Sequence, residues 1–320
     1  MFRTLLAALL ATLMAAIAPA HAQYPDKTVK IIVPFIAGSA PDVAARQVAE
    51  RLTAGLGQQF IVENRPGAAG NIGAEVGARA TPDGYTLMLM TSSHLVNPFL
   101  YAKVGYEPLK DFVPITIVSR IPSLMVVPPS SPAKSVREFV ALAKSRPGKL
   151  NYGSGGIGSL AHLSAEAFRL AAGIDYVHVP YKGAPDILRG LLGEQIDVGF
   201  PTMGTVSAQA KQGLLRPLAF TSCKRTPVLP DVPTLKEAMP SGFVQEAWFG
   251  LVAPAGTPKA VVDRLHAVLK AAATNPDFVA NLTRDGSEIV LNDPREFASM
   301  LPAESAERQE LIAKLGIKLE

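Results

Sequence analysis

Apolar runs bounded by turn residues alternate with stretches of helical period from end to end of the chain. This alternation is typical of an α/β protein with mostly parallel strands. The pattern predicts strands over residues 29–35, 60–63, 85–90, 115–127, 150–152, 177–180, 196–200, 216–220 and 246–253. It predicts helices over residues 43–55, 73–80, 135–144, 159–172, 185–192 and 205–212, followed by a mainly helical tail from residue 258.

Two of the extended stretches, residues 115–127 and 246–253, are long enough to carry the chain between two lobes. Two crossings fit an architecture in which both ends of the chain build the first lobe and the middle builds the second. A ligand cleft is expected between such lobes. We therefore expect a first lobe of residues 23–122 plus 225–320 and a second lobe of residues 123–224.

The first 22 residues have the pattern of a secretory signal peptide. Arg3 precedes an apolar run from Leu5 to Ile17, and Ala20-His21-Ala22 stands before Gln23. This pattern predicts cleavage after Ala22. The apolar run is too short to span a bilayer comfortably, and no cysteine follows it that could carry a lipid. We expect a soluble protein in the periplasm, beginning at Gln23.

Composition narrows the classes further. The formal net charge is +4, and no block of like charges occurs, so nucleic acid is not an expected partner. The single cysteine, Cys223, excludes an intrachain disulfide framework and a metal site with several cysteines. A mildly positive surface suits small anionic ligands.

Residues 149–172 read as a short strand, a glycine-rich turn and the opening of a helix. Glycines let the backbone approach a ligand closely, and Ser159 is placed to cap the helix. The free N–H groups of the first helical turn then face whatever lies in front of them. This order predicts a site for a carboxylate or a phosphate.

The same segment offers a competing interpretation. Gly153, Gly155 and Gly158 have the spacing of a dinucleotide fingerprint, and Asp175 stands at about the distance of a ribose-binding acid. Taken alone, this spacing indicates an NAD-dependent dehydrogenase. The secretory leader argues against that class.

Motifs of catalysis and metal binding give no support to an enzyme. Ser39 and Ser154 both lack a Gly-x-Ser-x-Gly environment, and neither a His-Glu-x-x-His motif nor a phosphate loop occurs. His162 and Glu166 give two metal ligands at most, so we expect His162 to pack its helix. We expect no catalytic residue, no metal and no cofactor. An enzyme acting on a small carboxylic acid in the periplasm stays the alternative.

Six blocks in order along the chain resemble the substrate-binding proteins of tripartite tricarboxylate transporters, also called the Bug family. The resemblance covers almost the whole chain after the leader. The blocks are Val33 to Gly38 with Asp42 and Ala45-Arg46, Glu63 to Gly73 continuing to Pro82–Leu87, Asn151 to Ser154 continuing to His162-Leu163, Val179 to Gly183, Asp231 to Thr234, and Trp248 to Leu251.

The resemblance implies a two-lobed periplasmic receptor of the Venus-flytrap type that captures a small carboxylate-bearing solute for a membrane permease. It implies that two loops, one from each lobe, hold the ligand carboxylate through backbone N–H groups, serine hydroxyls and water. The implied ligand-binding residues are Phe35, Ala37, Gly38 and Ser39 in the first loop and Ser154, Gly155, Gly156, Gly158 and Ser159 in the second. We expect a monomer that closes on its ligand and docks transiently on the permease.

The first loop departs from the usual family pattern at Ser39, where a second glycine is common. Ser39 either donates to the ligand or caps its helix through a capping box with Asp42. Asp42 itself is expected to cap the helix, because a ligand carboxylate would be repelled by it.

Other candidates follow strands at their carboxyl ends, where open α/β sheets bind ligands. Thr91 and Ser92 are predicted polar contacts, and His94 is either a donor or a residue at the rim of the cleft. Thr202 lies in a predicted contact loop of the second lobe. Lys182 is expected to be solvated and Trp248 to pack where the chain crosses between lobes.

Overall fold

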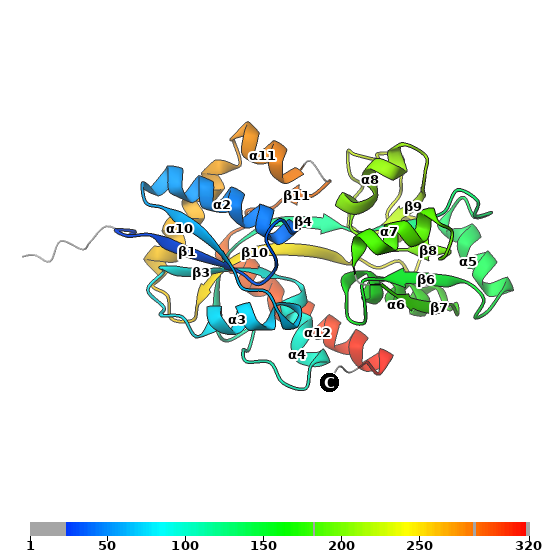
Figure 1. Ribbon diagram of the computed structural model, residues 1–320, viewed down its shortest axis with the longest axis horizontal. Helices are drawn as coiled ribbons and strands as arrows, with labels where there is room; N and C mark the ends of the chain where they lie inside the picture. Colours follow the sequence, from blue (N-terminus) through cyan, green and yellow to red (C-terminus); the bar gives the residue numbers. More distant parts are fainter. Residues whose placement is uncertain (1–23, 182, 284–285, 318–320) are drawn as a thin grey trace, which may run out of the picture.

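The computed structural model describes residues 24–181, 183–283 and 286–317. The chain forms two lobes, each an α/β unit around its own sheet, as the sequence predicts (Figure 1). Residues 1–23, on which the predicted leader falls, and Lys182 lie outside the described residues.

The first lobe contains a six-stranded sheet with the order β11-β4-β10-β3-β1-β2. β1 pairs in parallel with β2 and β3, whereas β10 runs antiparallel to β3 and β4, and β11 antiparallel to β4. The strands are β1 (Val29–Val33), β2 (Phe60–Asn64), β3 (Thr86–Thr91), β4 (Phe112–Pro122), β10 (Glu246–Pro254) and β11 (Glu288–Ile289).

The second lobe contains a five-stranded sheet with the order β7-β6-β8-β5-β9. β6 pairs in parallel with β7 and β8, and β5 runs antiparallel to β8 and β9. The strands are β5 (Leu124–Val127), β6 (Asn151–Ser154), β7 (Val177–Pro180), β8 (Val198–Gly199) and β9 (Arg216–Phe220).

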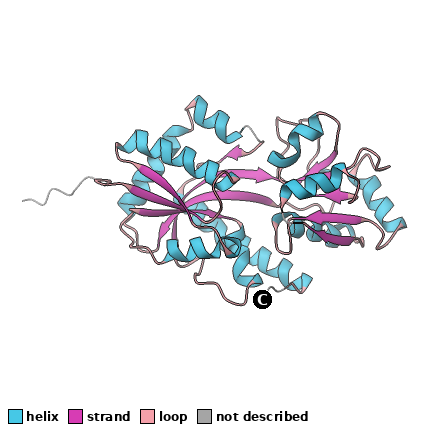
Figure 2. Ribbon diagram, viewed as in Figure 1, coloured by secondary structure: helices cyan, strands magenta, loops and turns pink. Residues whose placement is uncertain are grey.

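Helices cover the faces of both sheets (Figure 2). Those of the first lobe are α2 (Ala40–Leu56), η1 (Ala68–Gly70), α3 (Asn71–Ala78), α4 (Ser93–Leu100), α10 (Lys259–Ala272), α11 (Pro276–Thr283) and α12 (Pro294–Leu315). Those of the second are α5 (Val136–Ser145), α6 (Leu160–Ala172), α7 (Ala184–Leu192), α8 (Met203–Lys211) and α9 (Leu235–Ala238). None of these described helices is long and apolar enough to cross a bilayer.

Local sequence signals set several helix ends. Ser135 caps α5 by accepting a hydrogen bond from the Glu138 N–H at 3.2 Å, and Asp293 and Glu296 form a capping box at the start of α12. α2 ends at Gly57, which adopts the left-handed conformation that favours glycine.

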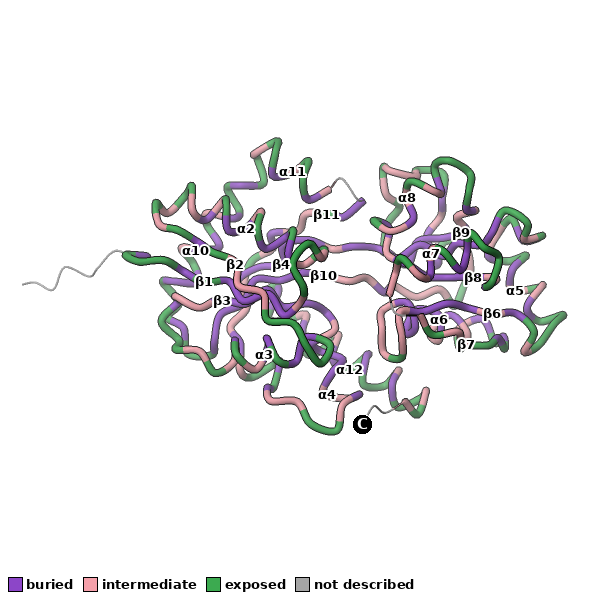
Figure 3. The backbone as a smooth tube through the Cα atoms, in the orientation of Figure 1, coloured by how far each residue is buried: buried purple, intermediate pink, exposed green. Residues whose placement is uncertain are grey.

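Each sheet carries its own apolar core. In the first lobe, β1 and β3 are buried, with α2 and α10 packed on one face of the sheet and α3 on the other. In the second lobe, Phe139 of α5 and Phe168 of α6 pack on the face that includes Tyr152. Buried strands therefore hold the more accessible loops that follow them; Figure 3 shows the loop after β1 as mainly exposed and the loop after β6 as mainly intermediate.

The structure corrects three sequence-based expectations. The predicted strand 115–127 is two strands, because the chain leaves the first sheet at Pro122 and enters the second at Leu124. The strands are not mostly parallel: both sheets are mixed, since β10 runs back between β4 and β3 and β5 lies antiparallel to both of its neighbours. Helix α4 was not predicted, because its proline and polar residues break the apolar period.

Candidate functional site

The predicted site residues occupy the carboxyl ends of four strands. In the first lobe, the loop Phe35–Ser39 follows β1, and Thr91 and Ser92 end the neighbouring parallel strand β3. In the second lobe, the loop after β6 and Thr202 after β8 again follow neighbouring parallel strands. Each lobe thus gathers its candidates at one edge of its sheet, where α/β proteins place ligands. We call Phe35–Ser39 the first loop and Ser154–Ser159 the second loop.

A buried carboxylate organises the first loop. Asp42 is 2% exposed, and its Oδ2 accepts a hydrogen bond from the Gly38 N–H at 2.8 Å. Arg46 binds the same carboxylate at 2.9 and 3.1 Å, and the Asn64 amide donates to Asp42 Oδ1 at 2.9 Å and to the Phe35 carbonyl at 3.0 Å. The loop is therefore tied to both α2 and β2.

Electrostatics keep this carboxylate charged. Burial by itself raises the pKa of Asp42, but hydrogen bonds from Arg46, Gly38 and Asn64 outweigh burial and hold the pKa below its usual value. All of these donors lie within the protein, and none is a backbone N–H of α2. Asp42 therefore holds the loop before α2 and does not cap the helix as the sequence predicted.

Ser39 does not cap its helix through its side chain. It precedes α2 with extended backbone angles, but its Oγ donates to the Ile36 carbonyl at 2.6 Å and forms no capping bond. The capping box with Asp42 is thus absent, because the Asp42 carboxylate takes the Gly38 N–H instead. The N–H groups of Ile36 and Ala37 donate to no other described residue.

Thr91 and Ser92 lie beneath the first loop and are nearly buried. Thr91 binds the buried His94 ring, since its N–H donates to Nδ1 at 3.0 Å and its hydroxyl lies 3.0 Å from the same atom. His94 in turn contacts Phe35 edge-to-face, with ring centroids 6.0 Å apart. Burial lowers the pKa of His94 to about 4, so the ring supports the loop as a neutral group.

The second loop is held by side chains of its own lobe. Ser154 is fully buried; its Oγ accepts from the Gly156 N–H at 3.1 Å and lies 2.6 Å from Nε2 of His178. The Gly158 N–H donates to Nδ1 of His162 at 3.2 Å.

The remaining donors of the second loop are free or serve the helix. Ser159 caps α6 by accepting from the His162 N–H at 3.3 Å, which confirms the predicted cap. The N–H groups of Gly155 and Ile157 donate to no other described residue. The loop therefore presents backbone donors rather than its serine hydroxyls.

The second loop touches the first lobe. A β-carbon at Gly158 would overlap the side chain of Leu100 at the end of α4. Leu100 also belongs to an apolar cluster that joins α4 and α12 of the first lobe to Leu163 of α6. In Figure 1, α12 runs under the first lobe and ends below the second. The position of the loop is thus coupled to the contact between lobes.

The other predicted residues lie at a distance from this contact. Thr202 precedes α8, and its hydroxyl lies 3.2 Å from that of Thr205. Trp248 is buried in β10 and packs on Phe297 near the crossing, as predicted. Within the described residues, no group of three or more His, Cys, Asp or Glu side chains is arranged to hold a metal ion.

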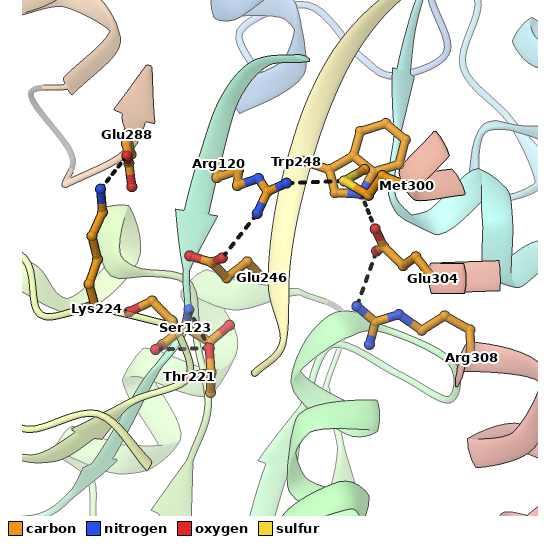
Figure 4. Close-up of polar contacts among 11 residues, drawn as sticks. Arg120, Ser123, Thr221, Lys224, Glu246, Trp248, Glu288, Met300, Glu304 and Arg308 are labelled. Carbon is orange, nitrogen blue, oxygen red and sulfur yellow. Dashed lines mark hydrogen bonds and ion pairs between the residues drawn. The ribbon is translucent and has the colours of Figure 1, made fainter. Parts of the chain in front are cut away.

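Two segments of the chain, the end of β4 and the start of β10, pass side by side between the lobes (Figure 4). Thr221 of the second lobe is bonded to the first of them: the Ser123 N–H donates to Thr221 Oγ1 at 3.0 Å, and the Thr221 N–H donates to the Ser123 carbonyl at 3.0 Å. Arg120 and Glu246 lie 3.8 Å apart on the paired strands β4 and β10, and burial raises the pKa of Glu246. A hydrogen bond of 2.9 Å from Trp248 Nε1 to Glu304 fixes α12 to the same place.

Hollows flank this junction on both sides. One, of about 230 Å³, lies between Arg120, Trp248 and Arg308. The other, of about 410 Å³, is lined by Lys224, Glu246, Glu288 and neighbouring residues. Neither hollow includes a residue of the first or second loop.

Sequence reasoning missed three residues that shape the loops. Asn64 lies at the end of β2, beside β1, so its position at a carboxyl strand end was an available signal. His178 is in β7, which pairs with β6 through the register Tyr152↔His178. Leu100 lies in the unpredicted helix α4, and no local pattern indicates its partner in the other lobe.

Comparison with known proteins gives the family. The sequence profile described as the tripartite tricarboxylate transporter family receptor matches residues 44–317. The sequence of the periplasmic binding protein BugD is 35% identical to this chain, and its solved structure matches with a TM-score of 0.77. The match covers 92% of this chain and 100% of the BugD chain.

Two further solved structures contain a bound acid. Rpa4515 of R. palustris, solved with adipate, is 34% identical with a TM-score of 0.80 and covers 92% of this chain and 100% of its own. MatC of Rhodopseudomonas palustris, solved with bound malate, is 30% identical with a TM-score of 0.76 and covers 90% of this chain and 100% of its own. The chain therefore belongs to the receptor family of the tripartite tricarboxylate transporters and is a two-lobed periplasmic solute receptor.

Proposed function

We propose that this receptor binds a small molecule carrying at least one carboxylate between the first and second loops and presents it to a membrane permease. The observation that carries the proposal is the set of free backbone donors, Ile36 and Ala37 in one loop and Gly155 and Ile157 in the other. Neutral N–H groups at strand ends and at the start of a helix bind carboxylates well. The adipate and malate bound by two relatives belong to the same chemical class.

Charge favours the loops over the larger of the two hollows at the junction. The larger hollow contains Glu246 and Glu288, which would repel a carboxylate, and its Lys224 is already paired with Glu288 at 2.5 Å. Neither loop contains an acidic residue. We therefore assign the ligand carboxylate to the loops, with Thr91, Ser92 and Thr202, at the ends of neighbouring strands, as further proposed polar contacts.

The Ser154–His178 pair is the feature that would favour an enzyme. The 2.6 Å between Ser154 Oγ and His178 Nε2 is within the range of a nucleophile and its base. Ser154, however, has no exposed surface, so a substrate carbonyl has no access to its hydroxyl. We assign the pair to loop structure and propose that the protein has no catalytic activity.

A thermal-shift screen of carboxylic acids, followed by calorimetry, tests the proposed ligand class. Adipate and malate are the first probes, and adipamide is the matched control because it keeps the carbon chain of adipate without its charge. We expect at least one acid to raise the melting temperature through mass action while adipamide does not. An equal shift by adipamide, or no shift by any acid in a broad panel, would reject the proposed class.

Export and assembly are proposed on the same basis. We propose cleavage of the leader after Ala22 and a monomer in solution. We also propose that the chain enters the second lobe at Ser123, as expected, but returns at about Glu246 rather than at residue 225, because α9 packs in the core of the second lobe and β10 begins at Glu246. The intact mass of the exported protein tests the cleavage: a mass that includes residues before Gln23 contradicts it.

A further inference from the structure

Two histidines of the second lobe contact the second loop directly. His162 is in the first turn of α6 and His178 is in β7, and their ring centroids lie 4.5 Å apart. His178 stacks on Tyr152 with centroids 4.8 Å apart and an interplanar angle of 16°. His162 receives the Gly158 N–H, and His178 contacts the Ser154 hydroxyl. Both ends of the glycine-rich turn are thus attached to one aromatic cluster.

The hydrogen bonds fix the protonation state of His162. A backbone N–H can only donate, so Nδ1 of His162 must accept from Gly158, and the ring proton must lie on Nε2. A proton added to Nδ1 would face the Gly158 N–H and break this bond. The Ser154 hydroxyl accepts from the Gly156 N–H, and its one proton faces two acceptors, the Gly156 carbonyl at 3.2 Å and Nε2 of His178 at 2.6 Å, of which His178 is the nearer.

Among the described residues, the neighbouring charged and titratable groups form no salt bridge with either histidine. They are Tyr152 on β6, Tyr176 just before β7, and Glu166 and Arg169 on α6. Glu166 is engaged elsewhere, because Tyr152 donates to Oε1 at 2.7 Å and Arg169 to Oε2 at 2.8 Å. Burial and, to a lesser extent, the nearby His178 together lower the pKa of His162 to about 4, against a smaller opposite effect of Glu166.

We propose that His162 and His178 are positioning residues for ligand binding, which as neutral imidazoles hold the second loop so that the N–H groups of Gly155 and Ile157 stay free for the ligand. The inference rests on the proposed binding of a carboxylate at this loop. Neither histidine needs to touch the ligand. Their contribution is a loop that is already ordered before binding, which lowers the entropic cost of association.

The first experiment compares two substitutions at one position. His162→Leu removes the acceptor, whereas His162→Asn places an amide oxygen near the former Nδ1 and restores it. Calorimetry with adipate should show a Kd weakened about five- to tenfold in the Leu variant and changed less than about threefold in the Asn variant. The buried His266→Leu on α10 of the first lobe is the matched control and should leave the Kd unchanged.

The second experiment needs no ligand. Amide exchange measured by NMR at neutral pH should show the Gly158 N–H protected in the wild type and in His162→Asn, and exposed in His162→Leu. His178→Ala should likewise lower the protection of the Gly156 N–H by freeing the Ser154 hydroxyl. This measurement separates the proposed carboxylate binding from the proposed role of the two histidines. If adipate and the other acids do not bind the wild type, the proposed function fails, but the exchange data still test whether the histidines hold the loop.

The inference is overturned if Gly158 and Gly156 exchange equally in the wild type, His162→Leu and His178→Ala. It is also overturned if the Leu and Asn variants, both folded by circular dichroism, bind adipate with the same Kd. If the melting temperature falls in both His162→Leu and His162→Asn but only His162→Leu loses affinity, the inference is supported. Should His162→Leu fail to fold, the pair His178→Ala and His178→Gln gives the same comparison at the Ser154 end.

Discussion

The two loops have the same place in their lobes but are held by opposite chemistry. The first loop is tied by an ionised carboxylate, Asp42, which takes the Gly38 N–H and is itself bound by Arg46. The second loop is tied by neutral imidazoles, with His162 taking the Gly158 N–H. In both loops one glycine N–H is bound by a side chain four residues later, and at least two other N–H groups donate to no described residue.

The comparison shows that a loop glycine N–H can be held either by a charged carboxylate or by a neutral imidazole. These two arrangements differ in their sensitivity to acid. The Asp42 carboxylate stays charged well below neutral pH, because its pKa is held below the usual value. The imidazole solution fails when the ring gains a proton. The second loop is therefore the part of the proposed site whose structure depends on pH.

The largest expected effect comes from adding a negative charge at each loop tip. Ile36 is 68% exposed and Ile157 is 50% exposed, so glutamate at either position should not disturb the fold. Two unit charges about 4 Å apart repel by about 1 to 4 kcal/mol, which weakens a carboxylate ligand about fivefold to several hundredfold. We expect losses of adipate affinity in both Ile36→Glu and Ile157→Glu, measured by calorimetry.

Leu214→Glu is the matched control, because Leu214 is 48% exposed in the turn before β9, away from both loops. It should bind adipate like the wild type. A loss in one loop variant alone would mean that the carboxylate is held by a single lobe. Unchanged binding in both would remove the loops from the proposed site.

The next effect concerns acid. His94 and His162 have a pKa of about 4 in the folded protein against 6.5 in the free side chain, so the unfolded chain binds more protons below pH 6.5. The free energy of unfolding should therefore be unaffected above pH 6.5 and fall as the pH drops from 6.5 to 4. For the fully buried His94 the loss is about 2 kcal/mol by pH 5.

Urea denaturation at a series of pH values measures this slope, and His162→Asn should reduce it. Amide exchange over the same range compares the loops directly: Gly158 should lose protection before Gly38, whose partner Asp42 stays charged. If Gly38 opens first, the assignment of acid sensitivity to the second loop is wrong.

The smallest effect distinguishes the two serines that precede the helices. Ser159 accepts a hydrogen bond from the His162 N–H and caps α6, whereas Ser39 forms no capping bond to α2. We expect Ser159→Ala to lower the free energy of unfolding by about 1 kcal/mol, and Ser39→Ala to lower it by less than about 0.5 kcal/mol. Equal losses in denaturant titrations would show that both serines stabilise their helices alike.

The sequence predicts features that depend on local pattern. The apolar run of β3 and the glycine-rich turn before α6 are recognisable because their signals lie within a few residues. Ser159 as a cap follows from the same local chemistry. The resemblance adds the two lobes and the pairing of the loops, which periodicity does not contain.

What the sequence does not predict depends on contacts between distant segments. The end of β4 at Pro122 and the start of β5 at Leu124 look continuous in the chain, and only sheet pairing separates them. His178 reaches Ser154 through a strand register, and Leu100 reaches Gly158 across the two lobes. The buried state of Ser154 likewise follows from packing, so a serine expected to donate to the ligand instead supports the loop.

The paired passage of the chain between the lobes, at Pro122–Ser123 and at Gln245–Glu246, has a mechanical consequence. The two segments are joined by the pairing of Glu246 with Pro122. Both are also bonded to Thr221 of the second lobe, which accepts from the Ser123 N–H at Oγ1 and from the Gln245 N–H at its carbonyl. Two hydrogen-bonded segments side by side bend easily out of their common plane, but they resist shear within that plane and torsion along their length. The lobes should therefore rotate relative to each other about a single hinge axis. A single distance measured between them then reports the whole trajectory of opening.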